Sequence, residues 1–207
     1  MKRPRDHSAL VTVGGIRLAR TFSNIVSPPV IFAVLGLALA WHEVGFWSGF
    51  AWAALFGFWV SLAPILFVVY LLRTKRISDL HMNTPRERRL PYVVSVVGAG
   101  VATALFFALN GPQLLSCLGV LSIFVLGSLG LINMVWLISI HTTSIAAAAV
   151  IATLVFDLRA GAAVSIFVIL VAWARLYLRR HTLAQVVAGL LVGSTSVLII
   201  RALGCFS

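Results

Sequence analysis

Arginine and histidine occur near the end of the chain at a spacing that suits phosphate chemistry. Arg175 precedes His181 by six positions at the end of an apolar run, and Gln185 follows that histidine four positions later, on the same helical face. A histidine at a helix start can present one ring nitrogen to a substrate while a residue one turn on holds the other nitrogen. The same spacing also arises when arginine and histidine only extend toward a membrane boundary. Both interpretations fit this segment taken alone.

A second histidine lies where one apolar run ends and the next begins. Ser139 and His141 are two positions apart there. Two apolar runs separate His141 from His181. If each run crosses the membrane, the chain crosses it twice, and both histidines are expected at the same membrane face. The alternative is that these polar residues cap a helix, a task that suits the hydroxyl residues at 142–144.

A basic stretch from 73 to 89 supplies the third group. Its cations include Lys75, Arg86, Arg88 and Arg89, and the number of intervening apolar runs puts them on the same face as the histidines. Most such charge runs are solvated loops. Two histidines together with several cations nevertheless fit phosphoryl transfer, in which cations balance the phosphoryl oxygens, one imidazole attacks and another protonates the leaving oxygen.

The elements that must hold these residues are transmembrane helices. Of the 207 residues, 61% are hydrophobic and 10% are charged, whereas soluble domains are about 45–50% apolar and about 25% charged. So much apolar surface needs lipid as its solvent. The apolar runs are continuous rather than alternating, which excludes a lipid-facing barrel. We therefore predict an all-α, polytopic transmembrane helix bundle.

Seven apolar runs are candidate spans, since a spanning helix needs about 20 residues. They cover residues 29–41, 47–72, 91–109, 114–136, 143–156, 160–177 and 183–200. The first and fifth are short, and the first could be tilted, re-entrant or fused to the next, so we expect six to seven spans. Residues 1–25 are basic and are predicted to lie along the membrane surface, ahead of a single transmembrane domain over 26–207.

The cations are distributed unevenly between the two faces. If all seven spans cross, 14 of the 16 Lys and Arg residues lie on the histidine-bearing face, and only Arg159 and Arg201 lie on the other. The positive-inside rule makes the rich face cytoplasmic, although phosphate-binding arginines would produce the same bias. Membrane orientation and headgroup contact explain the net charge of +11 better than nucleic acid does. We predict an integral multi-pass protein of a bacterial inner membrane.

Acidic residues are too few and too scattered for metal-dependent chemistry. The sequence has five of them: Asp6, Glu43, Asp79, Glu87 and Asp157. They form no paired aspartate cluster of the kind that binds magnesium-diphosphate, and no spacing suggests a zinc site. We therefore expect neither a metal nor another cofactor.

Three further side chains in or near the apolar runs are interpreted as structural. Cys117 lies inside an apolar run and Cys205 near the C-terminus, so they suggest no disulfide framework and are predicted to be inert fillers. Asn133, a polar residue in an apolar run, is explained more simply by a helix–helix hydrogen bond than by transport.

The motifs resemble those of the type 2 phosphatidic acid phosphatase superfamily, over roughly residues 70 to 200. The last motif of that family is Ser-Arg, five residues, His, three residues and Asp, often followed by a small-residue helix. Arg175, His181 and the pair at 188–189 keep this spacing, while Ala174 replaces the serine and Gln185 the aspartate.

The other two motifs are more divergent. The middle motif, Pro-Ser-Gly-His, keeps Ser139 and His141, with Ile140 in the glycine position. The first motif, Lys, six residues and Arg-Pro, is not reproduced. The stretch 86–91 is similar to a divergent bacterial branch of the family that uses an arginine-rich segment there.

This resemblance implies a mechanism and a set of site residues. His181 would become phosphorylated, His141 would protonate the leaving group, and Gln185 would orient His181. The remaining residues would bind phosphoryl oxygens: Arg175, Arg88, Arg86, Arg89, Lys75 and Ser139. The substrate would be a phosphorylated lipid, of the phosphatidate type or a polyprenyl phosphate or diphosphate.

Two alternatives remain open at this stage. Because Gln185 lacks the charge of the family's aspartate, the chain could be a lipid-phosphate binding or transport protein on the same scaffold. Asn133 is the one intramembrane hint of a small transporter or assembly subunit. The sequence identifies neither the lipid nor the oligomeric state. Nor does it settle which leaflet is served, since the charge count points to the cytoplasmic face and the family resemblance to the outer face.

Overall fold

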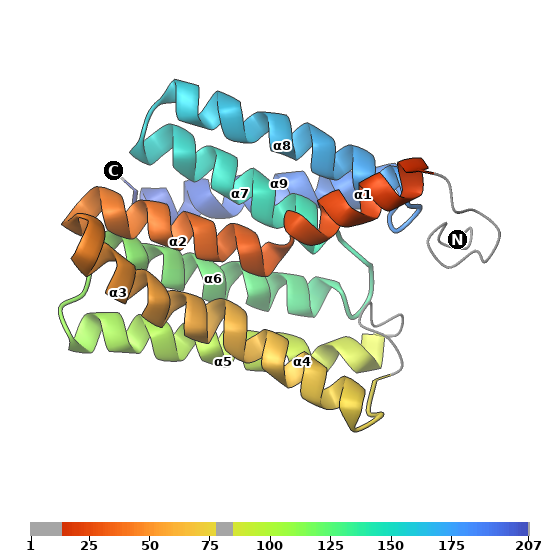
Figure 1. Ribbon diagram of the computed structural model, residues 1–207, viewed down its shortest axis with the longest axis horizontal. Helices are drawn as coiled ribbons and strands as arrows, with labels where there is room; N and C mark the ends of the chain where they lie inside the picture. The colour runs from red at the N-terminus through yellow and green to blue at the C-terminus, as the bar shows by residue number, and fades with distance from the viewer. Residues whose placement is uncertain (1–13, 78–84, 207) are drawn as a thin grey trace. The chain divides into compact units, whose positions relative to one another are not determined.

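The computed structural model describes residues 14–77 and 85–206, and these residues are helical with no strand. The all-α prediction is confirmed. The basic residues Lys2, Arg3 and Arg5 lie outside the described residues, as do Asp79 and His81. The elements, shown in Figure 1, are α1 (Gly14–Ile25), α2 (Pro28–Val44), α3 (Phe46–Gly57), the π-helical turn η2 (Phe58–Leu62), α4 (Ala63–Arg73), α5 (Pro85–Ala108), α6 (Gln113–Ile132), α7 (Ile140–Val155), α8 (Leu158–Tyr177) and α9 (Leu183–Ala202).

Several of these helices are long and apolar enough to cross a membrane. Within the described part of the chain there are five such spans: Phe46–Arg73, Glu87–Ala108, Gln113–Ile132, Leu158–Tyr177 and Leu183–Ala202. A sixth arises if α1 and α2, which meet at a 45° bend, count as one span, and α7 is a shorter apolar helix. The chain is a multi-pass membrane protein with a polytopic helix bundle, as predicted.

The basic stretch was expected to be a loop as far as residue 89, and this expectation is wrong. Helix α5 already begins at Pro85, so Arg88 and Arg89 lie in its first turns. Proline suits the first helical position because it has no N–H to leave unsatisfied, and Glu87 in the first turn complements the positive end of the helix dipole. Because of these two effects, α5 begins before the apolar run that starts at residue 91.

The chain forms two compact units. Unit 1 contains the described residues up to Ile31 and Leu137–Leu198, and unit 2 contains Phe32–Trp136 and the described residues from Ile199 onward. In unit 1, α7 and α8 run side by side in opposite directions (Figure 1), and α1 packs on α8 through a buried cluster of Ile16, Ala19, Ala174 and Leu178. Unit 1 therefore brings the N-terminal helix to the end of α8.

Glycines let α9 approach α7 closely in unit 1. Gly189 and Gly193 are four residues apart on one face of α9, the spacing by which small residues bring membrane helices together. A Cβ atom at Gly193 would overlap the backbone carbonyl of Thr143, and one at Gly189 would lie 2.8 Å from the carbonyl oxygen of Ser139. Backbone atoms cannot move aside as a side chain can, so both positions require glycine.

In unit 2, α5 packs against α6, and a hydrogen bond joins them near the C-terminal end of α6. Asn133 Nδ2 donates to the hydroxyl oxygen of Tyr92 at 2.6 Å. The predicted helix–helix hydrogen bond of Asn133 is therefore confirmed.

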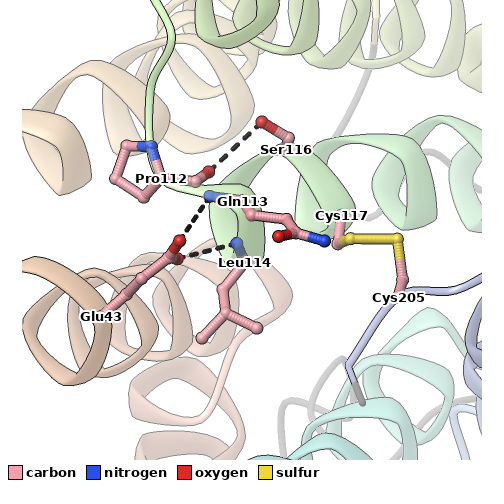
Figure 2. Close-up of a disulfide and its surroundings, with 7 residues drawn as sticks. All are labelled: Glu43, Pro112, Gln113, Leu114, Ser116, Cys117 and Cys205. Atoms are coloured by element: carbon pink, nitrogen blue, oxygen red, sulfur yellow. Dashed lines mark hydrogen bonds between the residues drawn. A yellow bond between two sulfur atoms is a disulfide. The ribbon is translucent and has the colours of Figure 1, made fainter.

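The prediction that the two cysteines are inert fillers is wrong. Cys117, in the second turn of α6, forms a disulfide with Cys205, and their Cα atoms are 5.6 Å apart (Figure 2). The pair is separated by 88 residues, and the left-handed Gly204, at φ +97°, turns the chain after α9 ends. Sequence spacing carries no record of such a long-range pairing.

The close approach of α9 to α7 predicts an unusual response to a glycine-to-alanine change. Alanine favours helices over glycine by about 1 kcal/mol, yet Gly193→Ala is expected to lower stability by about 1–3 kcal/mol because the new methyl group meets backbone. Thermal unfolding in detergent would measure this. Gly127→Ala is the matched control, since a Cβ there meets nothing within 4 Å. An equal or higher unfolding temperature for Gly193→Ala would contradict the packing described.

Candidate active site

The C-terminal end of α8 folds back so that His181 meets Arg175. The N–H of Arg180 donates to the carbonyl of Arg175 at 3.0 Å, and the N–H of Arg179 donates to that of Leu176 at 2.9 Å. This pair of bonds is a Schellman motif, which needs a left-handed residue after the helix. Arg179 takes that position at φ +53°, where glycine is usual. The strained turn brings His181 back to the helix it has just left.

Arg175 is buried, and its guanidinium contacts Ser23 and His181. Its Nη1 donates to Ser23 Oγ at 3.2 Å, and its Nη2 lies 3.2 Å from His181 Nε2. Arg175 is 8% exposed and His181 is 9% exposed. The alternative that these two side chains only extend toward a membrane boundary is therefore wrong, because both are held inside the unit.

The contact with Arg175 sets the protonation of the His181 ring. A guanidinium has only donors, so His181 Nε2 must be the acceptor in this contact. In the neutral ring the proton is then on Nδ1 and the lone pair is on Nε2. A lone pair held toward a guanidinium is the arrangement in which a nitrogen can attack a phosphorus atom whose oxygens that guanidinium binds.

Ser23 is a site residue that the sequence reasoning missed. It is buried in α1, 152 positions from Arg175 along the chain. A signal was present, because Ile16, Ala19 and Ser23 follow the 3- and 4-residue spacing of one helical face, so a hydroxyl replaces an apolar residue on the buried side of an amphipathic helix.

The start of α9 is stabilised by a capping box formed by Thr182 and Gln185. Gln185 Oε1 accepts from the N–H of Thr182 at 2.9 Å, and Thr182 Oγ1 accepts from the N–H of Gln185 at 3.4 Å. Gln185 is buried and its oxygen serves the helix start directly after His181. The orienting role predicted for Gln185 toward His181 stays a prediction.

The start of α7 lies beside the start of α9. Ser139, not one of residues 142–144, is the N-cap of α7, and its side chain accepts from the N–H of Thr142 at 3.4 Å. The N–H of Ser139 donates to the carbonyl of Gln185 at 3.4 Å, and Thr142 Oγ1 donates to that of Val186 at 3.3 Å. His141 is the second residue of α7 and is half-buried. Unit 1 thus brings His141 and His181 to one end.

The predicted phosphate-binding cations of the basic stretch belong to unit 2. Lys75 is exposed and adopts the left-handed conformation, φ +56°, at the end of α4. Arg88 is half-buried and Arg89 exposed in α5, whose second residue is Arg86. Their predicted role at the phosphate stays a prediction. Across residues 14–77 and 85–206, no three His, Cys, Asp or Glu side chains are grouped so as to hold a metal ion.

The site end of unit 1 is strongly cationic. Arg180 is buried next to His181, in addition to the buried Arg175. Among the described residues of unit 1 the one carboxylate is Asp157, which caps the opposite end of α8 by accepting from the N–H of Ala160 at 2.7 Å. Two helix N-termini, those of α7 and α9, add partial positive charge. This environment favours an anion.

Residues 133–204 match the family model of the PAP2 superfamily. The matched segment is about a third of the chain and contains α7, α8 and α9, with both histidines, Arg175 and Gln185. The resemblance stated from the sequence is confirmed, and the match supports a phosphatase-like function in general. No curated protein and no solved structure matches the chain.

The hydrogen bond from Arg175 to Ser23 predicts that α1 helps the PAP2-like segment to bind oxyanions. Ser23→Ala is expected to weaken vanadate binding several-fold, because Arg175 loses a hydrogen bond that helps to fix its guanidinium. Ser23→Thr keeps the hydroxyl and should bind nearly as the parent protein does. Vanadate protection against thermal unfolding measures the affinity.

Ser165→Ala is the matched control, since the hydroxyl of Ser165 bonds to Gly161 in its own helix. If Ser23→Ala and Ser165→Ala bind vanadate equally well, the hydroxyl of Ser23 does not position Arg175.

Proposed function

We propose that the protein is a lipid phosphate phosphatase that works without a metal ion, through a phosphohistidine at His181. The observation that carries this proposal is the 3.2 Å contact between Arg175 Nη2 and His181 Nε2 inside a buried, cationic site. It pairs a nucleophilic lone pair with the group that would hold the phosphoryl oxygens. The PAP2 superfamily match supports the general reaction class.

In the first step, the Nε2 lone pair of His181 attacks phosphorus in line with the bond to the lipid oxygen. That P–O bond breaks as the N–P bond forms, and His141 gives a proton to the departing oxygen. Arg175 exchanges its contact with Nε2 for contacts with the phosphoryl oxygens, whose charge it balances as the bonds change.

In the second step, water replaces the histidine. His141, now neutral, takes a proton from the water, whose oxygen attacks phosphorus as the N–P bond breaks. Inorganic phosphate leaves and His181 returns to its resting form, so that no external acid, base or metal is consumed. Ser139 is the further group of unit 1 proposed to contact the phosphoryl oxygens, and the role predicted for Lys75, Arg86, Arg88 and Arg89, which belong to unit 2, stays a prediction.

The surroundings of the site support a lipid as the carrier of the phosphate. Leu183, which begins α9 two residues after His181, is 65% exposed, and Val187 one turn later is also exposed. Trp173 stacks on Tyr177 at the end of α8, with ring centroids 5.2 Å apart. Exposed leucine and valine at the start of α9, and an aromatic pair of the kind found at membrane boundaries at the end of α8, fit acyl or prenyl chains.

The second candidate is a lipid-phosphate binder, and the neutral Gln185 favours it. A carboxylate behind a histidine stabilises the imidazolium as well as its direction, whereas an amide can only direct it. The transporter alternative loses its support, because the hydrogen bond to Tyr92 accounts for Asn133.

Replacement of the proposed nucleophile gives the most direct test. Purified protein is expected to release phosphate from phosphatidate or a polyprenyl diphosphate in EDTA, and His181→Ala should abolish release because no other group forms the covalent intermediate. His141→Ala should lower kcat by about 10²–10⁴-fold, the usual contribution of a general acid. Phosphate release is measured colorimetrically, and acid-labile ³²P on the protein reports the intermediate.

His42→Ala is the control, since His42 is exposed near the end of α2. Release that survives His181→Ala, or that EDTA abolishes, would rule out the proposed mechanism.

The role of Gln185 separates the enzyme from the binder. Gln185→Glu keeps the side-chain length, and so the cap on Thr182, while adding a carboxylate near His181; Gln185→Asp restores the residue of the family motif. For an enzyme, both variants are expected to raise the kcat of a parent that already turns over, because a carboxylate stabilises the imidazolium that the proposed reaction forms. Gln113→Glu makes the same chemical change at the exposed start of α6 and is the control. Activity that appears only in Gln185→Glu or Gln185→Asp would identify the parent as a binder.

A further inference from the structure

We propose that the His181 end of the bundle faces the reducing, cytoplasmic compartment and that the site acts on phosphate head groups of the leaflet on that side. The second half of this inference rests on the proposed function, whereas the first half does not. The cation distribution in the sequence points the same way, but phosphate-binding arginines would produce the same bias. The disulfide between Cys117 and Cys205 is independent of phosphate binding.

Helix α9 separates the site from the disulfide by the length of one span. It runs without interruption over Leu183–Ala202, starts two residues after His181 and ends three residues before Cys205. Twenty helical residues cover about 30 Å, the thickness of the hydrocarbon core. A helix that crosses the membrane therefore puts His181 at one surface and Cys205 at the other.

At the end that carries the disulfide, within unit 2, hydrogen bonds and the covalent bond hold the start of α6 in place. Glu43, near the end of α2, accepts from the N–H groups of Gln113 and Leu114 at 2.6 and 2.8 Å and so caps α6 (Figure 2). Cys117 lies one turn further along α6 and is bonded to Cys205. Stable disulfides form in oxidising compartments, whereas cytosolic thiols are kept reduced. This end is therefore assigned to the outer side.

The cations of each unit are concentrated at one of its ends. In unit 2, Arg88 and Arg89 begin α5, whose other end turns at Asn110 into the start of α6, and Arg201 is the one described cation near Cys205. In unit 1, Arg159 alone lies at the α7–α8 turn, opposite the cations that follow Arg175. The positive-inside rule assigns the rich end to the cytoplasm.

The disulfide and the cations indicate the orientation through different physics. Cations near the site could be present to bind phosphate, but a disulfide has no part in that chemistry. Its position reports the redox state of the compartment at the other end of α9. The disulfide and the cation distribution agree, and together they assign the site to the cytoplasmic side. The expected substrates are then lipids whose phosphate is exposed to the cytoplasm.

Single-cysteine labelling in intact cells tests the orientation. The labelling uses a Cys117→Ser/Cys205→Ser background. Leu203→Cys places a thiol just after the end of α9, at a position that is 76% exposed. Val135→Cys places a thiol just after the end of α6, at a position that is 92% exposed. A membrane-impermeant maleimide added to spheroplasts is expected to label Leu203→Cys directly and Val135→Cys only after lysis. The opposite pattern, or equal labelling from outside, overturns the proposal.

A second measurement uses the unmodified cysteines, in case the serine background folds poorly. Thiols are alkylated in cells, and the protein is then denatured and reduced; two thiols are expected to appear only after reduction. In a separate measurement, alkaline phosphatase fused after Ser207 is expected to be active. Two free thiols before reduction, or an inactive fusion, would overturn the assignment of the outer side.

Failure of this inference is distinguishable from failure of the proposed function. Neither labelling nor the fusion requires catalysis. In sealed vesicles, a water-soluble dioctanoyl phosphatidate should be hydrolysed by inside-out preparations, and by right-side-out ones only after detergent. Activity on the wrong side contradicts the orientation alone, whereas activity retained by His181→Ala contradicts the mechanism alone.

Discussion

The site depends on a sharp turn that returns the chain to the helix it has just left. Arg175 and His181 are six residues apart, too far to meet at 3.2 Å through one turn of a continuing helix. The left-handed Arg179 ends α8, and the capping box of Thr182 and Gln185 starts α9 at once. A left-handed non-glycine residue costs about 1–3 kcal/mol. The buried packing of α1, α7 and α9 around this turn must offset that cost.

The sequence predicts the helices well because they are recorded locally, in apolar runs of spanning length. The spacing of Arg175 and His181 selects two side chains that the structure brings into contact, while their chemical role stays a prediction. The features that were missed depend on distant partners. Ser23 acts through a residue 152 positions away, and Cys117 finds Cys205 only because α9 returns to the start of α6. The start of α5 was misplaced because helix-start signals, Pro85 and Glu87, precede its apolar run.

The two ends of α9 are stabilised by different means. At the His181 end, buried guanidinium groups and polar helix starts are held together by hydrogen bonds, and the charge there suits an anionic ligand. At the other end, a covalent bond and a carboxylate cap fix the start of α6. The disulfide constrains the chain far from the chemistry, so it can stabilise the bundle without altering the charge of the site.

The neutral side chain of Gln185 affects how the binding energy of a cationic site is divided between the ground state and the transition state. A carboxylate beside His181 would cancel part of the charge of Arg175 and Arg180 and would stabilise the imidazolium that forms as the reaction proceeds. The amide does neither, so the full positive charge acts on bound phosphate in the ground state as well as in the transition state. Only the difference between these two states accelerates the reaction. Under the proposed mechanism, the same residue that preserves the capping box would favour tight binding over fast turnover, which makes enzyme and binder two ends of one physical range.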